Sequence, residues 1–529
     1  MNRVPADRAP VRFVLFPGRH HLLTRFQAAY LDRLVAGAAV DEDGEAITTQ
    51  PPVTVVWAVT SANHGNTRRN PIPFDRREAA IERLSLSEGL RSLVIAVFDT
   101  EPTDRFAELT LKSIENAMRE RLALTPGDTV VACSTPEVSA LYRKLGFRIA
   151  PVELQHEDSP LRPWDVLTLL VEGDETWREL AHPATVDVFD RYGLAEDVRL
   201  IHADRIVGDE GTLTETRSYR TYIEAFEQSA ARKWAQAAPY VLPGRIVDVG
   251  CAMGATLELA ARDRRLHESD LIGIEVDRRL YGECVHKKAQ GAFSNPSTFF
   301  YQRNILAGPV LAERSVDTTL TFALTHEVLS YGGGTTALRG FAETVYDQTR
   351  PGGVWINSDV CGPSGRERQV VLRLDESDGV EAVGPRRLDR MAGDAVRAYL
   401  DGLSTRGRLV QFAEDFRRNA RVSFPCRWRE DGGALVRLAD AMEFMTHKDY
   451  LDSWLSESHE QFCALEYEDW CRLLADVGFE IDPVSHAWRN EWIVEHRLAP
   501  CARLESVAGD PIPWPETHVF LVARRPLNS

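Results

Sequence analysis

The sequence predicts an α/β protein with two doubly wound domains, each a largely parallel sheet with helices on both faces. Two observations carry this prediction. Short apolar strands alternate with helical segments over roughly the first 200 residues, and a second alternating series begins at residue 245 with a strand that turns through glycines into a helix. Such alternation is typical of parallel sheets, and a chain of 529 residues has room for two or three domains.

The first domain is expected at residues 11–200, after a leader at 1–10, and a linker at 201–216 leads to the second domain at 217–529. Strands of the first domain are expected where β-branched and apolar residues concentrate, at 11–16, 53–60, 93–98 and 129–133. Helices are expected where apolar side chains recur every three or four positions, at 24–34, 76–84 and 106–122.

Four segments of the first domain follow one another in a distinctive order and spacing. They are Phe16-Pro-Gly-Arg19, Ser61-Ala62 followed by residues 70–78, residues 134–147, and Glu172-Gly-Asp-Glu-Thr-Trp177. Together they resemble the nicotinamide-mononucleotide adenylyltransferase family, especially its archaeal type, over roughly residues 11–200. The resemblance implies a nucleotidyltransferase-like, Rossmann-like fold for this domain.

The catalytic signature of that family is degenerate in this chain. The family has a His-x-Gly-His turn after its first strand, and the four positions fall on Thr24, Arg25, Phe26 and Gln27. The ring of Phe26 prevents the close backbone approach that glycine allows, and Gln27 has no charge to offer a phosphate. The family's phosphate-binding arginine falls within residues 164–167, which include no cation. We therefore expect an inactive nucleotidyltransferase domain.

Other roles stay open for the first domain. His20 and His21, one turn earlier, are candidates to replace the missing imidazoles, although ordinary polar residues at a loop mouth are the simpler interpretation. Without these imidazoles, the domain either binds a nucleotide-like group or serves as a scaffold or homodimer surface.

The second domain begins with a strand that is followed directly by a glycine turn. The strand contains Asp248 and breaks at Gly250 and Gly254, where a helical pattern starts. Such a turn brings main-chain amides close to a ligand at a helix N-terminus. About twenty residues later another apolar strand ends at Glu275, and an acid there can accept both hydroxyls of a ribose.

The pattern Asp-x-Gly-x-x-x-Gly at 248–254, with Ala252 where many members have a middle glycine, resembles motif I of class I S-adenosylmethionine-dependent methyltransferases. Later segments follow that family's order, with strands at 299–305, 315–322 and 351–359, a helix at 466–477 and final strands at 478–484 and 517–524. The resemblance implies a Rossmann-like fold and S-adenosyl-L-methionine as the cofactor. The cofactor-binding residues that it implies are Asp248, Gly250, Cys251, Gly254, Glu275, Asn304, Ile305 and Phe322. The resemblance implies that Asn304 bonds the adenine amine and that Ile305 lies against the ring.

Two insertions distinguish this domain from a minimal member of the family. One, at about 362–463, leaves from the sheet edge where substrates bind, so we expect a lid or substrate-recognition subdomain. The other, at 488–515, lies between the last two strands. Small insertion cores are the simpler interpretation of most aromatic residues here. The candidates for substrate contact are Arg220 and Tyr222, on an expected helix before the first strand, and His447 and Tyr450 in the first insertion.

Two residues after the fourth strand are candidates for catalysis. Methyl transfer from a sulfonium is an in-line displacement, and an oxygen or protonated nitrogen acceptor needs a base. His326 is the first candidate because imidazole titrates near neutral pH, and Glu327 is able to do the same work or to neutralise a cationic amine. A histidine that only caps this turn is an almost equally good interpretation.

Composition narrows the class of protein. With 44% hydrophobic and 27% charged residues the chain is expected to be soluble and globular, and a net charge of −17 argues against nucleic acid or a membrane as partner. The eight cysteines are scattered, without metal-ligand spacing, so we expect free thiols, no metal site and a cytoplasmic location.

We therefore predict S-adenosylmethionine-dependent methyl transfer to an oxygen or nitrogen of a small molecule, with the first domain as a nucleotide-binding or scaffold module. Two alternatives stay open. A bifunctional enzyme would first nucleotidylate and then methylate its substrate. A non-enzymatic sensor would bind a nucleotide and S-adenosylmethionine without forming S-adenosylhomocysteine.

Overall fold

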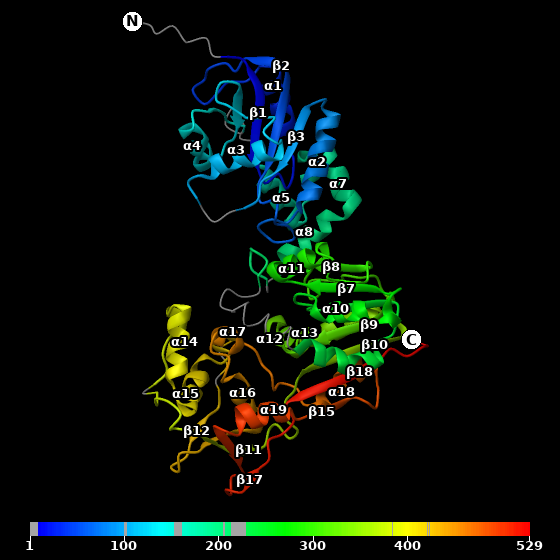
Figure 1. Ribbon diagram of the computed structural model, residues 1–529, viewed down its shortest axis with the longest axis vertical. Helices are drawn as coiled ribbons and strands as arrows, with labels where there is room; N and C mark the ends of the chain where they lie inside the picture. Colours follow the sequence, from blue (N-terminus) through cyan, green and yellow to red (C-terminus); the bar gives the residue numbers. More distant parts are fainter. Residues whose placement is uncertain are drawn as a thin grey trace. The chain divides into compact units, whose positions relative to one another are not determined.

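The computed structural model describes residues 9–99, 103–152, 161–204, 207–212, 229–382, 384–420, 422 and 424–528. The chain divides into two compact units (Figure 1). One is formed by Met1–Arg205 with Asp209–Gly211, and the other by Ile206–Gly208 with Thr212–Ser529. Among the described residues, no helix is long and apolar enough to cross a membrane.

The first unit contains a parallel sheet in the order β3-β2-β1-β4-β5. Its strands are β1 (Val11–Gly18), β2 (Thr49–Val59), β3 (Arg91–Ala96), β4 (Thr129–Ala132) and β5 (Arg148–Ala150). The four expected strands are confirmed, and β5 is an addition whose three residues are too few to produce a strand pattern in the sequence. The parallel α/β architecture is confirmed, while the likeness to a nucleotidyltransferase stays a prediction.

Helices pack against both faces of this sheet. They are α1 (Arg25–Val35), α2 (Phe74–Ser87), α3 (Phe106–Ala117), α4 (Pro136–Lys144), α5 (Pro163–Glu172), α6 (Trp177–Leu180), α7 (Pro183–Tyr192) and α8 (Leu194–Ala203). One core lies under α1, α2, α5, α7 and α8, and the other lies under α3 and α4. The third helix ends at Ala117 instead of residue 122, because Arg119 and Glu120 take left-handed backbone angles (φ 52° and 59°) that end a helix.

The second unit is built on a sheet in the order β14-β18-β10-β9-β6-β7-β8. The strands are β6 (Arg245–Val249), β7 (Asp270–Glu275), β8 (Thr298–Gln302), β9 (Val316–Phe322), β10 (Thr349–Val360), β14 (Glu480–Ile481), β15 (His486–Trp488) and β18 (His518–Arg524). Neighbours from β10 to β8 run parallel, and β18 is antiparallel to β10, β14 and β15. The strands expected along this domain are confirmed, and β14 and β18, which correspond to the final pair, run antiparallel as expected.

The arrangement of this sheet indicates where a ligand can bind. From β6 the chain proceeds to β7 and β8 on one side, and it then returns to β9 and β10 on the other side. The carboxyl ends of β6 and β9 therefore meet at a topological switch point, where open α/β sheets bind ligands. Helices cover both faces, namely α10 (Ala255–Arg262), α11 (Arg278–Ala289), α12 (Thr325–Gly332), α13 (Thr335–Gln348) and α18 (Tyr467–Val477).

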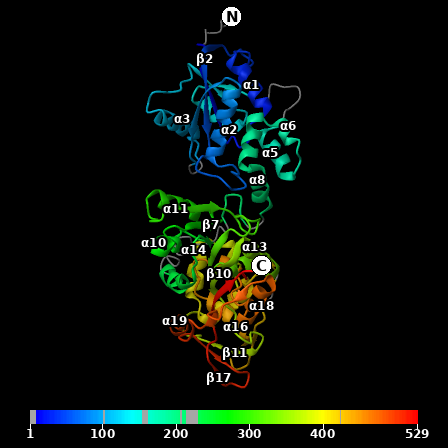
Figure 2. The same cartoon turned by 90° about the vertical axis from the view of Figure 1, so that its right-hand side faces the viewer.

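The two insertions fold together into one subdomain. Its antiparallel sheet has the order β12-β13-β11-β16-β17, and both views draw it at one end of the second unit (Figures 1 and 2). Central β11 pairs with β13 of the first insertion on one side and with β16 of the second insertion on the other. The elements are β11 (Gln369–Leu374), α14 (Gly393–Gly402), α15 (Thr405–Asp415), β12 (Arg427–Trp428), β13 (Ala434–Arg437), α16 (Leu438–His447), α17 (Trp454–Glu457), α19 (Glu491–Ile493), β16 (Ala502–Glu505) and β17 (Pro511–Ile512).

A single core holds the subdomain together. Phe412, Phe444 and Trp454 lie in it and are almost fully buried, and Val494, Leu498 and Leu504 of the second insertion belong to the same cluster. The structure thus corrects the expectation of small insertion cores, because strands from both insertions are needed to complete one sheet and one core.

Candidate active site

The turn between β6 and α10 folds back onto the neighbouring strand β7. Gly250, Ala252 and Gly254 all take left-handed backbone angles (φ 70°, 48° and 74°). The amides of Gly250 and Cys251 both donate to the carbonyl of Ile274, at 2.8 and 3.2 Å. A side chain at Gly250 would meet the end of the Leu324 side chain at 2.8 Å, and the left-handed backbone angle is what requires glycine at this position.

The carboxylate of Glu275 helps to hold this turn. Its Oε2 accepts a hydrogen bond from the amide of Ala252 at 2.9 Å, and its Oε1 accepts one from the amide of Asp277 at 2.8 Å. Burial raises the pKa of Glu275 to about 8, although both hydrogen bonds oppose the shift. Each oxygen keeps a further lone pair, so contact with a ribose stays a prediction beside this structural role.

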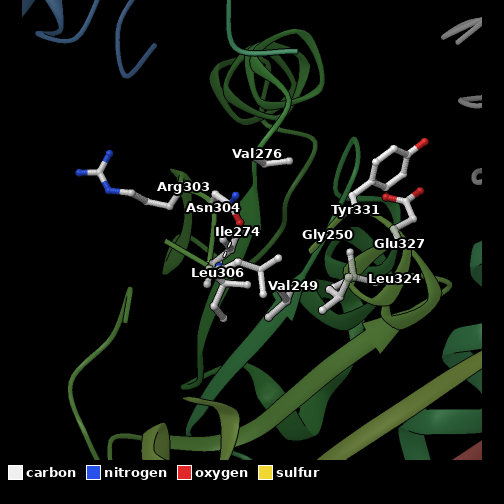
Figure 3. Close-up of a pocket in the computed structure, with 12 residues that line it drawn as sticks. Val249, Gly250, Ile274, Val276, Arg303, Asn304, Leu306, Leu324, Glu327 and Tyr331 are labelled. Carbon is white, nitrogen blue, oxygen red and sulfur yellow. Dashed lines mark hydrogen bonds between the residues drawn. The ribbon is translucent and has the colours of Figure 1, made fainter. Parts of the chain in front are cut away.

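A first pocket opens on one side of Gly250. Its floor is apolar, and the side chains that face it come from the ends of β6 and β7, from the segment after β8 and from α12 (Figure 3). The lining residues are Val249, Gly250, Ile274, Val276, Arg303, Asn304, Ile305, Leu306, Leu324, Glu327, Val328 and Tyr331. The pocket thus combines an apolar surface with a small number of polar groups, as ligand sites usually do.

A second, more polar pocket lies on the other side of Gly250. Asp248 and Lys233 both line it, together with Cys251, Thr256 and Phe322. Burial raises the pKa of Asp248 to about 7, and the charge of Lys233 opposes this shift. Burial lowers the pKa of Lys233 to about 8, against the charges of Asp359 and Asp248. The pocket therefore holds one acid and one base whose pKa values both lie near physiological pH.

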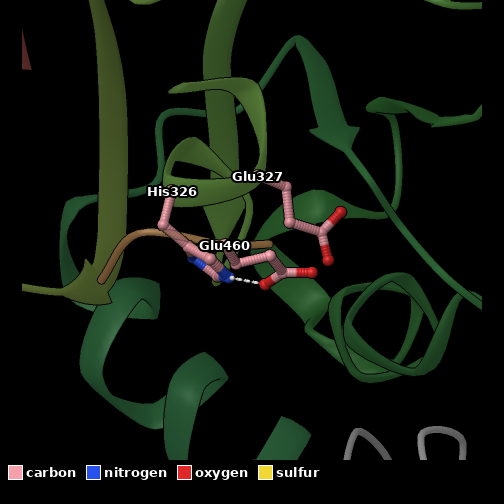
Figure 4. A group of neighbouring side chains, drawn as sticks. All are labelled: His326, Glu327 and Glu460. Carbon is pink, nitrogen blue, oxygen red and sulfur yellow. Dashed lines mark ion pairs between the residues drawn. The ribbon is translucent and has the colours of Figure 1, made fainter. Parts of the chain in front are cut away.

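A cluster of titratable side chains lies where α12 meets the insertion subdomain (Figure 4). The imidazole Nδ1 of His326 is 2.6 Å from Oδ1 of Asp359, and its Nε2 is 3.3 Å from Oε2 of Glu460. Glu327 completes the group, and one potential ligand atom from each of His326, Glu327 and Glu460 lies within 4.8 Å of the other two. The hydroxyl of Tyr331 donates to Oε1 of Glu460 at 3.2 Å.

The protonation state of His326 follows from its two carboxylate neighbours. Burial by itself disfavours the imidazolium, but the charges and hydrogen bonds of Asp359 and Glu460 outweigh it and raise the pKa of His326 well above its usual value. The pKa of Asp359 falls to about 2, because its interactions with His326 and Thr325 outweigh its burial. At neutral pH His326 therefore already carries the proton that a general base would have to accept.

The structure brings most of the predicted cofactor residues to the two pockets. Asn304, Ile305 and the predicted catalytic Glu327 line the first pocket, Asp248, Cys251 and Phe322 line the second, and Gly250 borders both. Gly254 instead forms the left-handed N-cap of α10. Glu275 holds the turn by accepting a hydrogen bond from the amide of Ala252. The roles of these residues in binding stay predictions.

Of the predicted substrate contacts, the structure describes His447 and Tyr450. His447 is 1% exposed, and its ring stacks on Phe462 with 3.9 Å between centroids. It therefore packs in the subdomain core, contrary to the expectation, and has no surface for a substrate. Tyr450 is 38% exposed and its contact with a substrate stays a prediction. Arg220 and Tyr222 lie outside the described residues.

Three residues of the site were not predicted from the sequence. Lys233 lies on the helical segment 229–237, where the sequence shows an apolar face but gives no sign that a lysine turns toward Asp248. Asp359 is the last residue of the strand expected at 351–359, and this position at a strand end is the only local feature of the sequence that could have indicated a role for it. Glu460 lies in the first insertion, far from His326 in sequence, so no local pattern connects the two.

The first unit has a cavity of its own, of about 510 Å³. It is surrounded by residues 16–22 at and after the end of β1, by residues 132–137 at and after the end of β4, and by the start of α5. Burial lowers the pKa of His20 to about 4, despite a hydrogen bond to the carbonyl of Phe16. Burial, with the charges of Arg77 and Arg19, lowers the pKa of His21 well below its usual value. Both imidazoles are therefore neutral at physiological pH and offer no charge to a phosphate.

Thr24 and Gln27, at the positions of the family's histidines, have a structural role. The hydroxyl of Thr24 accepts a hydrogen bond from the amide of Gln27 at 3.1 Å, and the side-chain oxygen of Gln27 accepts one from the amide of Thr24 at 3.2 Å. This reciprocal pair is a capping box at the start of α1. Both side chains are buried and hold the helix end.

We expect the protein to release no pyrophosphate from ATP or another nucleoside triphosphate in the presence of a mononucleotide, because no charged imidazole lines the cavity of the first unit. A coupled pyrophosphate assay on the full chain measures this. The variants His20→Ala and His21→Ala are the controls. Turnover by the wild type that either substitution abolishes would contradict the expectation and support a bifunctional enzyme.

No family model and no curated protein matches this chain. Similar solved structures include an S-adenosylmethionine-dependent methyltransferase from Mesorhizobium loti, with 14% identity, 55% of this chain and 97% of that chain covered, and a TM-score of 0.29. Another is the geranyl diphosphate C-methyltransferase from Streptomyces coelicolor A3(2), solved with Mg²⁺, geranyl diphosphate and S-adenosyl-L-homocysteine. Its identity is 11%, the match covers 61% of this chain and 89% of that chain, and the TM-score is 0.30. A third is the [4+2]-cyclase SpnF, with 14% identity, 59% of this chain and 85% of that chain covered, and a TM-score of 0.28.

The enzyme class and the cofactor predicted from the sequence are those of the first two proteins. Identities and TM-scores of this size do not decide an activity, and one fold serves many reactions. The function is therefore argued from the residues of the site.

Proposed function

We propose that the second unit is an S-adenosylmethionine-dependent methyltransferase that acts on an oxygen or nitrogen of a small molecule. The observation that carries this proposal is the pair of pockets on the two sides of Gly250. S-adenosylmethionine has an adenosine at one end and a zwitterionic amino acid at the other, and the linings of the two pockets complement these two ends in turn.

The first pocket complements the adenosine. Ile274 and Ile305 provide apolar surface for the base, and the side-chain amide of Asn304 offers both a donor and an acceptor. The pocket encloses about 70 Å³ in this structure, which is less than the several hundred Å³ that ligand pockets usually offer. We therefore expect Leu324, which packs against Gly250, to move aside when the cofactor binds.

The second pocket complements the methionine end. We assign the carboxylate of Asp248 to the α-ammonium group and the ammonium of Lys233 to the α-carboxylate, because both side chains line this pocket. Both residues titrate near physiological pH without a ligand, because burial disfavours their charges. A zwitterion supplies the opposite charge to each of them, so its binding stabilises the charged forms of both.

The acceptor is proposed to bind at the carboxyl end of β9, beside Glu327 and Glu460. Its oxygen or nitrogen attacks the methyl carbon in line, the bond from carbon to sulfur breaks, and the electron pair stays on sulfur to give S-adenosylhomocysteine. The acceptor's proton passes to one of the two carboxylates. His326, as an imidazolium, serves as a hydrogen-bond donor that orients Glu460.

The first unit is proposed to serve as a nucleotide-binding or scaffold module. Support comes from its cavity of about 510 Å³, which is large enough for a nucleotide, and from the neutral state of His20 and His21. A cavity without charged imidazoles is able to hold a ligand, but it lacks the imidazolium groups with which a His-x-Gly-His turn stabilises a phosphoryl transition state.

The assignment of the two pockets is tested by comparing S-adenosylmethionine with adenosine. Asn304→Ala is expected to weaken binding of both ligands about fivefold, the loss of one neutral hydrogen bond of about 1 kcal/mol. Asp248→Asn is expected to weaken S-adenosylmethionine only, because adenosine has no ammonium group. Calorimetric titration measures both. Equal losses for both ligands in Asp248→Asn would show that the pockets are assigned wrongly.

A further inference from the structure

The geometry points to a binding site for one divalent transition-metal ion, held by His326, Glu327 and Glu460 between α12 and the insertion subdomain. The sequence predicted no metal site, because its argument rested on the spacing of cysteines. Two of these three ligands come instead from the first turn of α12, and the third is a residue more than a hundred positions later.

The spacing of the donor atoms favours this site. Metal–nitrogen and metal–oxygen bonds of about 2.1 Å place neighbouring ligand atoms about 3 Å apart. Nε2 of His326 and Oε2 of Glu460 already lie 3.3 Å apart, and the Glu327 carboxylate completes a group within 4.8 Å. Figure 4 shows the two glutamates entering from different segments beside the imidazole. A rotamer change of Glu327 brings its oxygen to ligand distance.

The surroundings of the imidazole are those of a metal-binding histidine. Metal-ligating histidines usually donate their other ring nitrogen to a carboxylate, which fixes the ring. Asp359 does this for Nδ1 of His326, and Asp359 itself accepts hydrogen bonds from the amide and the hydroxyl of Thr325, at 2.6 and 2.5 Å. Tyr331 in turn orients Glu460. The ion takes the place of the proton between Nε2 and Glu460, and that proton is released to solvent.

The mixed ligand set indicates the class of ion. One imidazole and two carboxylates match the preferences of Mn²⁺, Fe²⁺ or Zn²⁺, whereas Ca²⁺ and Mg²⁺ prefer oxygen ligands alone. Three protein ligands leave positions open for water or an acceptor oxygen. If the proposed methyl transfer is correct, the ion would lower the pKa of a bound acceptor group, and that group's proton would then pass to solvent instead of to Glu327 or Glu460, which hold the ion.

The same contacts would make the ion a connection between the sheet and the insertion. The amide of Gln461 donates to the hydroxyl of Ser330 at 2.8 Å, and the hydroxyl of Tyr331 donates to the carbonyl of Ser456 at 3.3 Å. The segment that contains Glu460 is therefore already held against α12. An ion that binds both sides is expected to raise the thermal unfolding temperature of the second unit.

The test uses the full-length chain, first treated with a chelator and then titrated with Mn²⁺ under electron paramagnetic resonance and with Zn²⁺ in a calorimeter. We expect one site per chain, with affinity reduced at least tenfold in Glu460→Gln and in Glu327→Gln. Glu443→Gln is the matched control, because Glu443 is another buried glutamate of the subdomain, and it bonds to the amides of Phe462 and Cys463. It should bind both ions as the wild type does.

The outcomes separate this inference from the proposed function. Binding that is absent, or unchanged in both Glu460→Gln and Glu327→Gln, overturns the metal site. Circular dichroism identifies a variant that fails to fold, and the other variant then decides. S-adenosylmethionine binding is measured on the same samples. If the protein binds S-adenosylmethionine but no metal ion, the methyltransferase proposal is retained and the metal site is rejected. If it binds the metal ion but no S-adenosylmethionine, the metal site is retained and the methyltransferase proposal is rejected.

Discussion

Replacing Asp248 by asparagine is expected to weaken S-adenosylmethionine binding by about 10- to 100-fold. Asp248 is the carboxylate of the second pocket, and hydrogen bonds to charged groups contribute about 1.5–3 kcal/mol. Asparagine keeps the shape and removes the charge. Asp317→Asn is the control, since Asp317 is a buried aspartate at the opposite end of the sheet, where it accepts a hydrogen bond from the amide of Arg245. An unchanged affinity in Asp248→Asn would contradict the proposed contact between Asp248 and the α-ammonium group of S-adenosylmethionine.

The same contact predicts how the affinity depends on pH. The pKa of Asp248 is about 7, so its carboxylate becomes available to an ammonium group as the pH rises through that value. The pKa of Lys233 is about 8, and above it Lys233 loses its charge, as does the α-amino group of the ligand. Affinity should therefore be greatest between about pH 7 and 8 and fall on both sides. Asp248→Asn should lack the rise on the acid side.

Replacing Asp359 by asparagine is expected to lower the free energy of unfolding of the second unit by about 3 kcal/mol. Removing one partner of a buried ion pair leaves the other without compensation, which costs about 3–5 kcal/mol. Asp359 is buried at the end of β10, and its carboxylate contacts His326 and Thr325. Urea unfolding of chelator-treated protein, followed by tryptophan fluorescence, measures the change.

A second buried aspartate provides the comparison. Asp415 lies in the insertion subdomain and accepts hydrogen bonds from Gln411 and Trp454, at 2.9 and 2.8 Å. Burial raises its pKa, in contrast to Asp359, so the folded protein gains little from its charge. Asp415→Asn should cost less than 1 kcal/mol, within the range of ordinary substitutions. Equal losses in the two variants would mean that Asp359 acts through its shape and not through its charge.

The fold and the centre of the site were predictable because their signals are local. The strand, the glycine turn and the helix around Asp248 and Gly250 occupy fewer than twenty residues. Because left-handed backbone angles favour glycine, the turn can be recognised from its glycines in the sequence. The acid at Glu275 and the amide at Asn304 follow at the ends of the next two strands. Alternation of strands and helices then determined the architecture of both sheets.

The rest depended on contacts between residues far apart in the chain. Glu460 reaches His326 only after an insertion has folded, and that insertion needs β16 of the second insertion to complete its sheet. The same folding buries His447 behind Phe462, although the sequence around it is as polar and aromatic as that of a binding segment. Lys233 was missed because helical periodicity identifies the buried face but not which charged residue points into a pocket.

The most direct test of the central claim is a calorimetric titration of the wild-type chain with S-adenosylmethionine, with ATP and NAD as competing ligands. We expect one site that binds S-adenosylmethionine and that neither ATP nor NAD displaces, because the second pocket pairs Asp248 and Lys233 with the two charges of an amino acid. Absence of binding, or binding of NAD at this site instead, would contradict the assignment of the cofactor and with it the proposed methyl transfer.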